Sequence, residues 1–239
     1  MRTTGRPPSA NGASSFHLAW EPVPPPAHEV SVTLTIDHEP PYRHLVFWAL
    51  QVDFSTGWGS AGGAHLGLQW NPLHPGSGAV NWGGYDREGR VLAGSRSSLS
   101  SAPDNSNTRD FAWSPGQPYR LTIRAGAERG HWTGSVRAIP RGHEQVIRDL
   151  YVSADALVRP MVWSEVFARC DDPPVAATWR DPVAHTARGP AEPVAYRVSY
   201  QSEEAGGCSN TDVVRTAEGI RQVTGNERRT PAGALVSLD

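Results

Sequence analysis

The sequence contains no lysine. All 22 basic residues among its 239 residues are arginines, and 24 acidic residues outnumber them. A net charge of −2 without a basic block does not suit a nucleic-acid partner, because binding to phosphates needs a positively charged face. Long apolar runs are also missing. The longest, Leu45 to Leu50, has six residues, whereas a membrane span needs about 20.

No apolar stretch follows the two arginines near Met1, so the start of the chain does not read as a secretory signal. These absences predict a soluble, cytoplasmic protein with neither a nucleic-acid nor a membrane partner.

The sequence also has few groups that could hold a metal or form a nucleophilic centre. It has no Cys-x-x-Cys, His-Glu-x-x-His or Gly-x-Ser-x-Gly pattern, and no Gly-x-Gly-x-x-Gly run stands between a predicted strand and a helix, so we expect no metal and no cofactor. Its only cysteines are Cys170 and Cys208. For a cytosolic chain two reduced thiols are favoured, and a single disulfide remains the alternative.

Proline and small residues dominate residues 1–27, which end in Pro22-Val-Pro-Pro-Pro26. Such a stretch is typical of an extended or mobile segment rather than a helix. We therefore predict a flexible N-terminal segment over 1–27. A single β-sandwich domain with a loop-rich C-terminal extension follows over 28–239.

Alternation of apolar and polar residues is the main signal in the body of the chain. From Glu29, the side chains of Val30, Val32, Leu34 and Ile36 point one way and the intervening ones the other. About nine or ten such segments follow, separated by Gly/Pro turns, and no convincing long helix occurs among them. The pattern predicts an all-β fold, an antiparallel two-sheet β-sandwich.

Several segments share a strand, Trp/Gly turn, strand rhythm: Phe47–Asp53, Gly67–Trp70, Phe111–Arg124, Gly130–Val136 and Ile147–Val152. This rhythm resembles that of uncharacterised bacterial members of the concanavalin-A-like lectin and glucanase superfamily. The resemblance implies a jelly roll whose concave face often holds a saccharide. The Glu-x-Asp-x-x-Glu run of the resembling glucanases is absent here.

A polar stripe opposite the apolar faces is the strongest functional feature. Its members lie on three successive predicted strands: Gln51, Asp53, His65, Gln69, Asn71 and Asn81. If these strands are neighbours, the stripe lines one surface, and its amide, carboxylate and imidazole groups suit a hydroxyl-rich ligand. An ordinary solvated face is the competing interpretation.

Trp58 and Trp82 flank the stripe, one in a glycine-rich loop and one on a predicted strand. An exposed indole beside small residues can act as a platform for a sugar ring. We therefore include both tryptophans among the predicted ligand-binding residues.

Glu165 is the candidate catalytic carboxylate. It shares strand parity with Met161, Trp163 and Phe167, which predicts partial burial and a raised pKa suited to a general acid. Asp53 is the candidate second carboxylate, although a simple ion pair with an arginine is the favoured role for Glu165.

Three hypotheses follow. The first is non-catalytic binding of a carbohydrate or similar hydroxyl-rich small molecule on the concave face. The second is a glycan-active or natural-product enzyme using Glu165 and Asp53 as acid/base carboxylates. The third is an oligomer-forming sandwich with a tryptophan-rich interface, and the sequence leaves the oligomeric state open.

Overall fold

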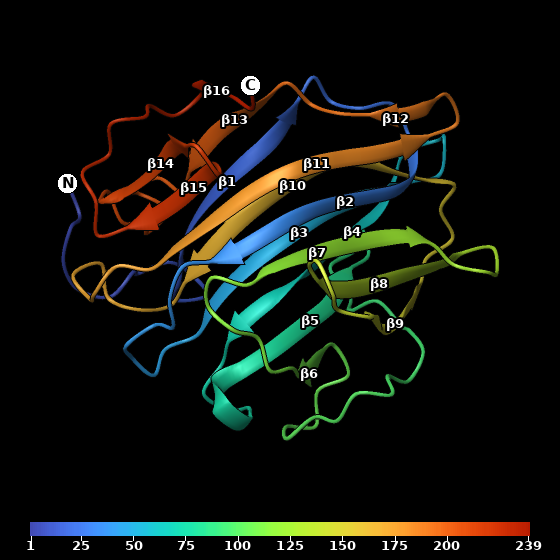
Figure 1. Cartoon of the computed structure of the whole chain (residues 1–239), viewed down its shortest axis with the longest axis horizontal. Helices are drawn as coiled ribbons and strands as arrows, with labels where there is room; N and C mark the ends of the chain where they lie inside the picture. The colour runs from blue at the N-terminus through green and yellow to red at the C-terminus, as the bar shows by residue number, and fades with distance from the viewer.

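A computed structural model describes all 239 residues and shows two packed antiparallel sheets (Figure 1). We call them the β3 sheet and the β2 sheet after a central strand of each. In spatial order the β3 sheet comprises β16 (Leu235–Ser237), β13 (Ala195–Tyr200), β1 (Ser14–Glu21), β10 (Ala156–Val166), β3 (Val46–Ser55), β4 (Ser60–Trp70), β5 (Gly78–Tyr85) and β6 (Thr108–Asp110).

The β2 sheet comprises β14 (Thr211–Thr216), β15 (Gly219–Thr224), β11 (Ala176–Thr186), β2 (Ala27–Ile36), β7 (Pro118–Ala125), β8 (His131–Ala138) and β9 (Glu144–Tyr151), with β12 (Gly189–Ala191) beside β11. The sheets are joined where Leu157 of β10 pairs with Ala27 of β2. The only helical element is the short 3-10 turn η1 (Pro75–Ser77), and no helix is long and apolar enough to cross a membrane. The predicted all-β sandwich is therefore confirmed.

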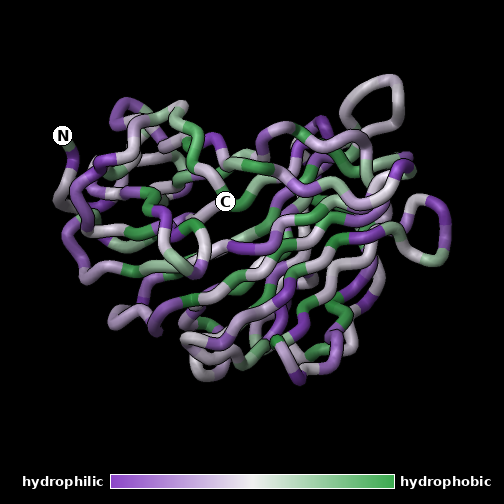
Figure 2. Tube along the Cα trace, turned by 45° about the horizontal axis from the view of Figure 1, so that its top comes forward, coloured by the Kyte–Doolittle hydropathy of each residue, from purple (hydrophilic) through white to green (hydrophobic).

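The hydrophobic core lies between the sheets and contains a cluster of 41 buried residues. The predicted alternation places them there, and Figure 2 shows apolar and polar residues alternating along the strands. Val30, Val32, Leu34 and Ile36 of β2 are each at most 1% exposed. Their carbon surface is removed from water together with that of the facing sheet, which is the main stabilising contribution in such a fold.

The prediction of a flexible segment over residues 1–27 is corrected by β1. This strand lies inside the β3 sheet, paired with β10 on one side and with β13 on the other. Its Phe16, Leu18 and Trp20 are buried in the core. The alternation of β1 is short and ends at Glu21, immediately before the proline-rich stretch, so the sequence did not reveal it.

The predicted loop-rich C-terminal extension contains four strands. β13 lies inside the β3 sheet, the β14–β15 hairpin continues the β2 sheet, and β16 borders β13. Cys170, after β10, and Cys208, before β14, form a disulfide with an S–S distance of 2.07 Å. The prediction of two reduced thiols is therefore wrong.

Candidate functional site

An aromatic cluster lies on the outward face of the β3 sheet, away from the main core. Phe47, His65 and Trp163 contact one another edge to face, with ring centroids 4.9 to 5.7 Å apart. They come from β3, β4 and β10, which are adjacent strands. Phe47 and Trp163 are only 5% and 7% exposed, so this surface forms a second, small core.

Gln51 and His65 stand directly opposite each other on β3 and β4 beside this cluster. The Trp163 indole Nε1–H donates to Gln51 Oε1 at 2.9 Å. Because an indole N–H can only donate, this bond fixes the amide so that its NH2 group points away from Trp163. Burial lowers the pKa of His65 to about 4, so its imidazole is neutral near pH 7. The structure thus brings these two predicted stripe residues together.

Glu165 lies on the same outward face of the β3 sheet as Trp163, two residues further along β10. Asn11 donates to its Oε1 at 2.7 Å, and burial raises the pKa of the carboxyl. The partial burial expected from strand parity is therefore present. On the neighbouring strand β1, burial lowers the pKa of His17, which stands opposite Trp163.

Asp53 is not the partner of Glu165. Glu165 pairs with Phe47, and Asp53 is six residues further along β3. At about 3.3 Å per residue the two carboxyls are roughly 20 Å apart, well beyond the 5–9.5 Å that a glycosidase pair needs. Asp53 instead forms an ion pair with Arg159, the two being 2.6 Å apart. A bulge in β10, where Arg159 has φ 49°, turns this arginine toward it.

The amides at the other end of the stripe are used within the protein. Gln69 and Asn81 are only 5% and 8% exposed. Asn71 Nδ2 donates to Gln69 Oε1 at 3.1 Å, and Asn81 Nδ2 donates to Thr108 Oγ1 at 2.8 Å. The second bond helps hold the short edge strand β6 against β5, so these residues support the sheet edge.

Trp82 is a core residue, contrary to the prediction that it flanks a ligand. It is fully buried, and its Nε1–H donates to the Trp132 carbonyl at 3.3 Å. Gly134 lies so close that a Cβ atom there would meet the Trp82 ring at 2.6 Å. Alternation along β5 already placed Trp82 with Val80 on the apolar side, which was the better guide.

Trp58 occupies a different place from the stripe, in the loop between β3 and β4. Its side chain is 99% exposed. Gly57, at φ 76°, provides the left-handed backbone that turns the loop at this point. Trp58 lines a hollow of about 610 Å³ together with Tyr151, Val91, Asp86 and Arg90. We call this the Trp58 hollow.

The other members of the Trp58 hollow were not among the residues predicted from the sequence. Val91 and Tyr151 are 58% and 44% exposed, and they lie in the β5–β6 connection and at the end of β9. Asp86 accepts hydrogen bonds from the backbone N–H groups of Glu88 and Arg90, which helps keep its pKa low. No local pattern shows that these loops meet, although the exposed Asp86-Arg-Glu-Gly turn was a visible polar signal.

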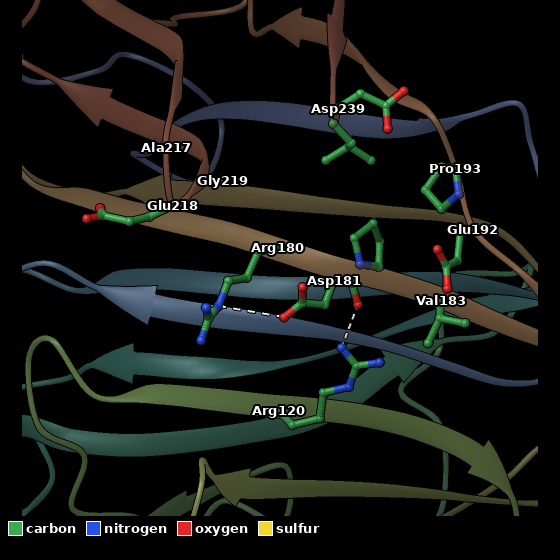
Figure 3. A pocket seen from close by; sticks show the side chains of 12 residues that line it. Arg120, Arg180, Asp181, Val183, Glu192, Pro193, Ala217, Glu218, Gly219 and Asp239 are labelled. Carbon is green, nitrogen blue, oxygen red and sulfur yellow. Dashed lines mark hydrogen bonds and ion pairs between the residues drawn. The ribbon is translucent and has the colours of Figure 1, made fainter.

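Two further hollows lie over the outward face of the β2 sheet. One, of about 630 Å³, is lined by Arg120, Arg180 and Asp181 among others (Figure 3). Asp181 has φ 52° at a bulge in β11, and its backbone carbonyl accepts a hydrogen bond from Arg120. A second hollow, of about 260 Å³, shares Arg120 with the first.

Histidine, cysteine and acidic side chains do not gather anywhere in groups of three or more that could hold a metal ion.

Comparison with known proteins gives a likeness of fold only. No family model and no curated protein matches the chain. Among solved structures, scytalido-glutamic peptidase with a transition state analog inhibitor matches 88% of this chain and 98% of its own, at 10% identity and a TM-score of 0.49. SCP-B, an eqolisin peptidase in complex with the tripeptide Ala-Ile-His, matches 89% and 96% at 11% identity and a TM-score of 0.45.

A more distant match is basic winged bean lectin with Tn-antigen, which covers 70% of this chain and 77% of the lectin at 11% identity and a TM-score of 0.28. The two-sheet β-sandwich that the resemblance implied is shown by the strand pairing of this chain itself. The chemistry of the site has to be argued from this chain's own residues.

Proposed function

We propose that the protein binds a hydroxyl-rich small molecule, with saccharides as the first candidates, in the Trp58 hollow. The observation that carries the proposal is the 99% exposure of the Trp58 indole at the edge of a hollow. An indole in water is costly unless a partner covers it, and ligand sites are concave surfaces with a few polar groups among apolar ones.

The remaining lining suits a sugar. Tyr151 and Val91 add apolar surface, and the Tyr151 ring is itself supported by His131 at a centroid distance of 4.6 Å. Asp86 and Arg90 add an acceptor and a donor whose positions are fixed by their mutual bond of 2.7 Å between Nε and Oδ2. Sugar rings present apolar C–H faces and hydroxyl rims, so they need this combination.

The contribution of Trp58 to the binding free energy follows from the indole area that a ligand would cover. Stacking one face of the indole against a ring removes on the order of 100 Å² from water, which contributes about 2–3 kcal/mol. Loss of the indole should therefore weaken binding by roughly 30-fold or more.

The test is a neutral glycan array followed by calorimetry on the glycans that bind. We expect Trp58→Ala to lose binding by at least about 30-fold without a change in unfolding midpoint, because the indole packs against little. The matched control is Leu73→Ala, which removes another exposed apolar side chain, 73% exposed, from the β4–β5 connection. An array without any bound glycan, or equal affinities of the two variants, would contradict the proposal.

Light scattering of the same proteins addresses the alternative in which Trp58 lies in an interface. A wild-type dimer that becomes a monomer in Trp58→Ala would assign the indole to self-association instead.

A second candidate function, acid–base hydrolysis, is favoured by the placement of Glu165 close to His17. They lie diagonally on the adjacent strands β10 and β1, where Cβ atoms are about 7–8 Å apart. Burial raises the pKa of one and lowers that of the other, which favours a protonated acid beside a neutral base. Glu165 would then protonate a leaving group while His17 takes a proton from water.

Assays of wild type on oligosaccharide and peptide panels test this second candidate. If turnover is found, Glu165→Gln should reduce it by about 100-fold or more, because an amide cannot donate a proton in the same way. Glu39→Gln changes an exposed glutamate of the β2–β3 connection that forms no ion pair, and it should have no effect. Absence of turnover by wild type on both panels contradicts the hydrolase reading and leaves the binding proposal standing.

A further inference from the structure

Arginines form a row across the outward face of the β2 sheet. The strand registers place Arg180 opposite Thr33, Thr33 opposite Arg120, and Arg120 opposite Arg137. Side chains at directly opposite positions point to the same face with Cβ atoms about 4.5–5.5 Å apart. The side chains of Arg120 and Arg137 therefore start side by side on β7 and β8.

Neither of these two guanidinium groups has a carboxylate partner. Arg120 donates to Ser31 Oγ at 2.7 Å, to Thr33 Oγ1 at 3.3 Å and to a backbone carbonyl, and all three acceptors are uncharged. Arg137 is exposed and has neither an ion pair nor a side-chain hydrogen bond. Neither guanidinium group therefore forms an ion pair, although Glu144 stands directly opposite Arg137 on β9.

The nearby carboxylates are already engaged. Glu144 forms an ion pair with Arg124 and accepts a hydrogen bond from Ser135 Oγ at 2.6 Å. Glu29 faces His185, with 3.7 Å between its Oε1 and the imidazole Nε2. They act on Arg137 and Arg120 through space without forming an ion pair with either.

The space between these charged groups is the hollow of about 260 Å³, and no hydrophobic residue lines it. Its floor consists of the small hydroxyl side chains Ser31, Thr122 and Ser135. The Thr122 hydroxyl has no partner within the protein. Arg120 also lines the adjoining 630 Å³ hollow, which gives a larger ligand room to extend.

We propose that this hollow is a second ligand site, which binds a small hydroxylated molecule through one anionic group held between Arg120 and Arg137. A guanidinium group presents a planar fork of N–H donors that matches a carboxylate, sulfate or phosphate. The Thr122 hydroxyl supplies a donor or acceptor for a neighbouring ligand hydroxyl. The site is independent of the Trp58 hollow, which lies among the loops at one end of the sandwich.

The acidic residues around the row restrict the ligand. Glu29, Glu144 and Asp181 would repel further negative charges, so a polyanion such as a nucleic acid is disfavoured. A single anionic group accompanied by hydroxyls fits the local charge better than an ion with charges along its whole length.

Calorimetric titration with four matched probes tests the proposal: glucose, glucuronate, glucose 6-sulfate and glucose 6-phosphate. At least one anionic probe should bind, and its affinity should fall by about threefold or more when NaCl is raised from about 50 to 500 mM. Its binding should persist in Trp58→Ala, which separates this site from the first. Failure of all three anionic probes to bind overturns the proposal.

The decisive variant is Arg137→Gln, because Arg137 makes no contact that the fold needs. We expect it to weaken the anionic probe by at least about tenfold, as removal of a charged hydrogen-bond donor usually does. Arg120→Gln should do the same if it folds. The matched control, Arg43→Gln, removes an exposed arginine without an ion pair in the β2–β3 connection and should change affinity less than twofold. Equal loss in the Arg137 and Arg43 variants would reduce the effect to overall charge and refute the site.

Discussion

The outward faces of the two sheets differ in a way that their strand patterns do not reveal. The β3 sheet covers its outward face with Phe47, Trp163 and neutral imidazoles, which bury one another. The β2 sheet covers its outward face with hydroxyls and arginines, and its tryptophans, Trp132 and Trp179, point inward. One face is a small additional core, whereas the other is an open charged surface.

Both faces use the same local device at comparable places. β10 and β11 each contain a bulge, with Arg159 at φ 49° in one and Asp181 at φ 52° in the other. Each bulge directs a charged side chain onto the outward face. On the β3 sheet Arg159 meets the carboxylate of Asp53, whereas on the β2 sheet Asp181 offers only its backbone carbonyl to Arg120. The two bulges thus differ in use: one completes an ion pair on the β3 sheet, and the other places a backbone acceptor beside Arg120 and the Asp181 carboxylate beside Arg180 on the β2 sheet.

The largest expected difference between the faces is in stability. Trp163→Ala should lower the free energy of unfolding by about 3–5 kcal/mol, because it removes a nearly buried indole. Arg124→Ala, on the β2 sheet, removes a partly exposed ion pair and should cost about 1 kcal/mol or less. Urea unfolding of both variants makes the comparison, and equal losses would contradict the view of the β3 face as a second core.

The pH dependence of stability should come from the aromatic face near pH 5. Between pH 6.5 and about 4 the unfolded chain binds a proton at His65 that the folded chain does not, so unfolding becomes easier as the pH falls. This contribution reaches at most about 3 kcal/mol. The difference in unfolding free energy between wild type and His65→Gln should change through this window and level off below it. A constant difference would show that His65 titrates normally.

Glu165→Gln is expected to have a smaller, stabilising effect. Because burial raises the pKa of Glu165, its contribution to stability is full below its ordinary value of 4.5 and is lost as the pH rises through the folded-state pKa. At pH 7 the amide should therefore raise the free energy of unfolding by about 1 kcal/mol, since it keeps the Asn11 bond without a buried charge. Thermal unfolding at pH 7 and pH 4 measures this, and the gain should vanish at the lower pH.

The smallest effect belongs to the arginine face. Arg137→Gln should change the free energy of unfolding by no more than a few tenths of a kcal/mol, because it relieves repulsion by Arg120 on β7 and also removes attraction to Glu144 on β9. High salt should reduce the difference further, since it screens both interactions. A loss of about 1 kcal/mol or more in urea unfolding, with no such loss in Arg43→Gln, would contradict this balance.

The fold was largely predictable because period-two alternation carries it. The strand starting near Glu29 and the residues from Val46 to Phe54 appear as expected, with their apolar sides inward. β1 was missed because its alternation is short and adjoins a proline-rich stretch. The disulfide could not be decided, since the spacing of Cys170 and Cys208 does not show whether β10 and β14 end near each other.

The candidate sites were predictable only where residues are neighbours through strand register. Gln51 and His65 lie opposite each other, as predicted, because β3 and β4 are consecutive in the sequence and paired in the sheet. Asp53 and Glu165 were predicted to act together, but they lie far apart along their strands. That separation cannot be known from the sequence before the strand register is known. The Trp58 hollow and the arginine row join residues from distant parts of the chain, such as Thr33, Arg120 and Arg180, and no local pattern connects them.

The position of β1 has a consequence for biosynthesis. Ser14 pairs with Val166 and Phe16 with Tyr200, so both neighbours of this strand belong to the last third of the protein. At ribosomal speeds of 5–20 residues per second, β1 waits roughly 10 to 30 seconds for them. During that time Phe16, Leu18 and Trp20 line one side of an unpaired strand on the nascent chain, which makes β1 the segment most in need of protection from aggregation before synthesis is complete.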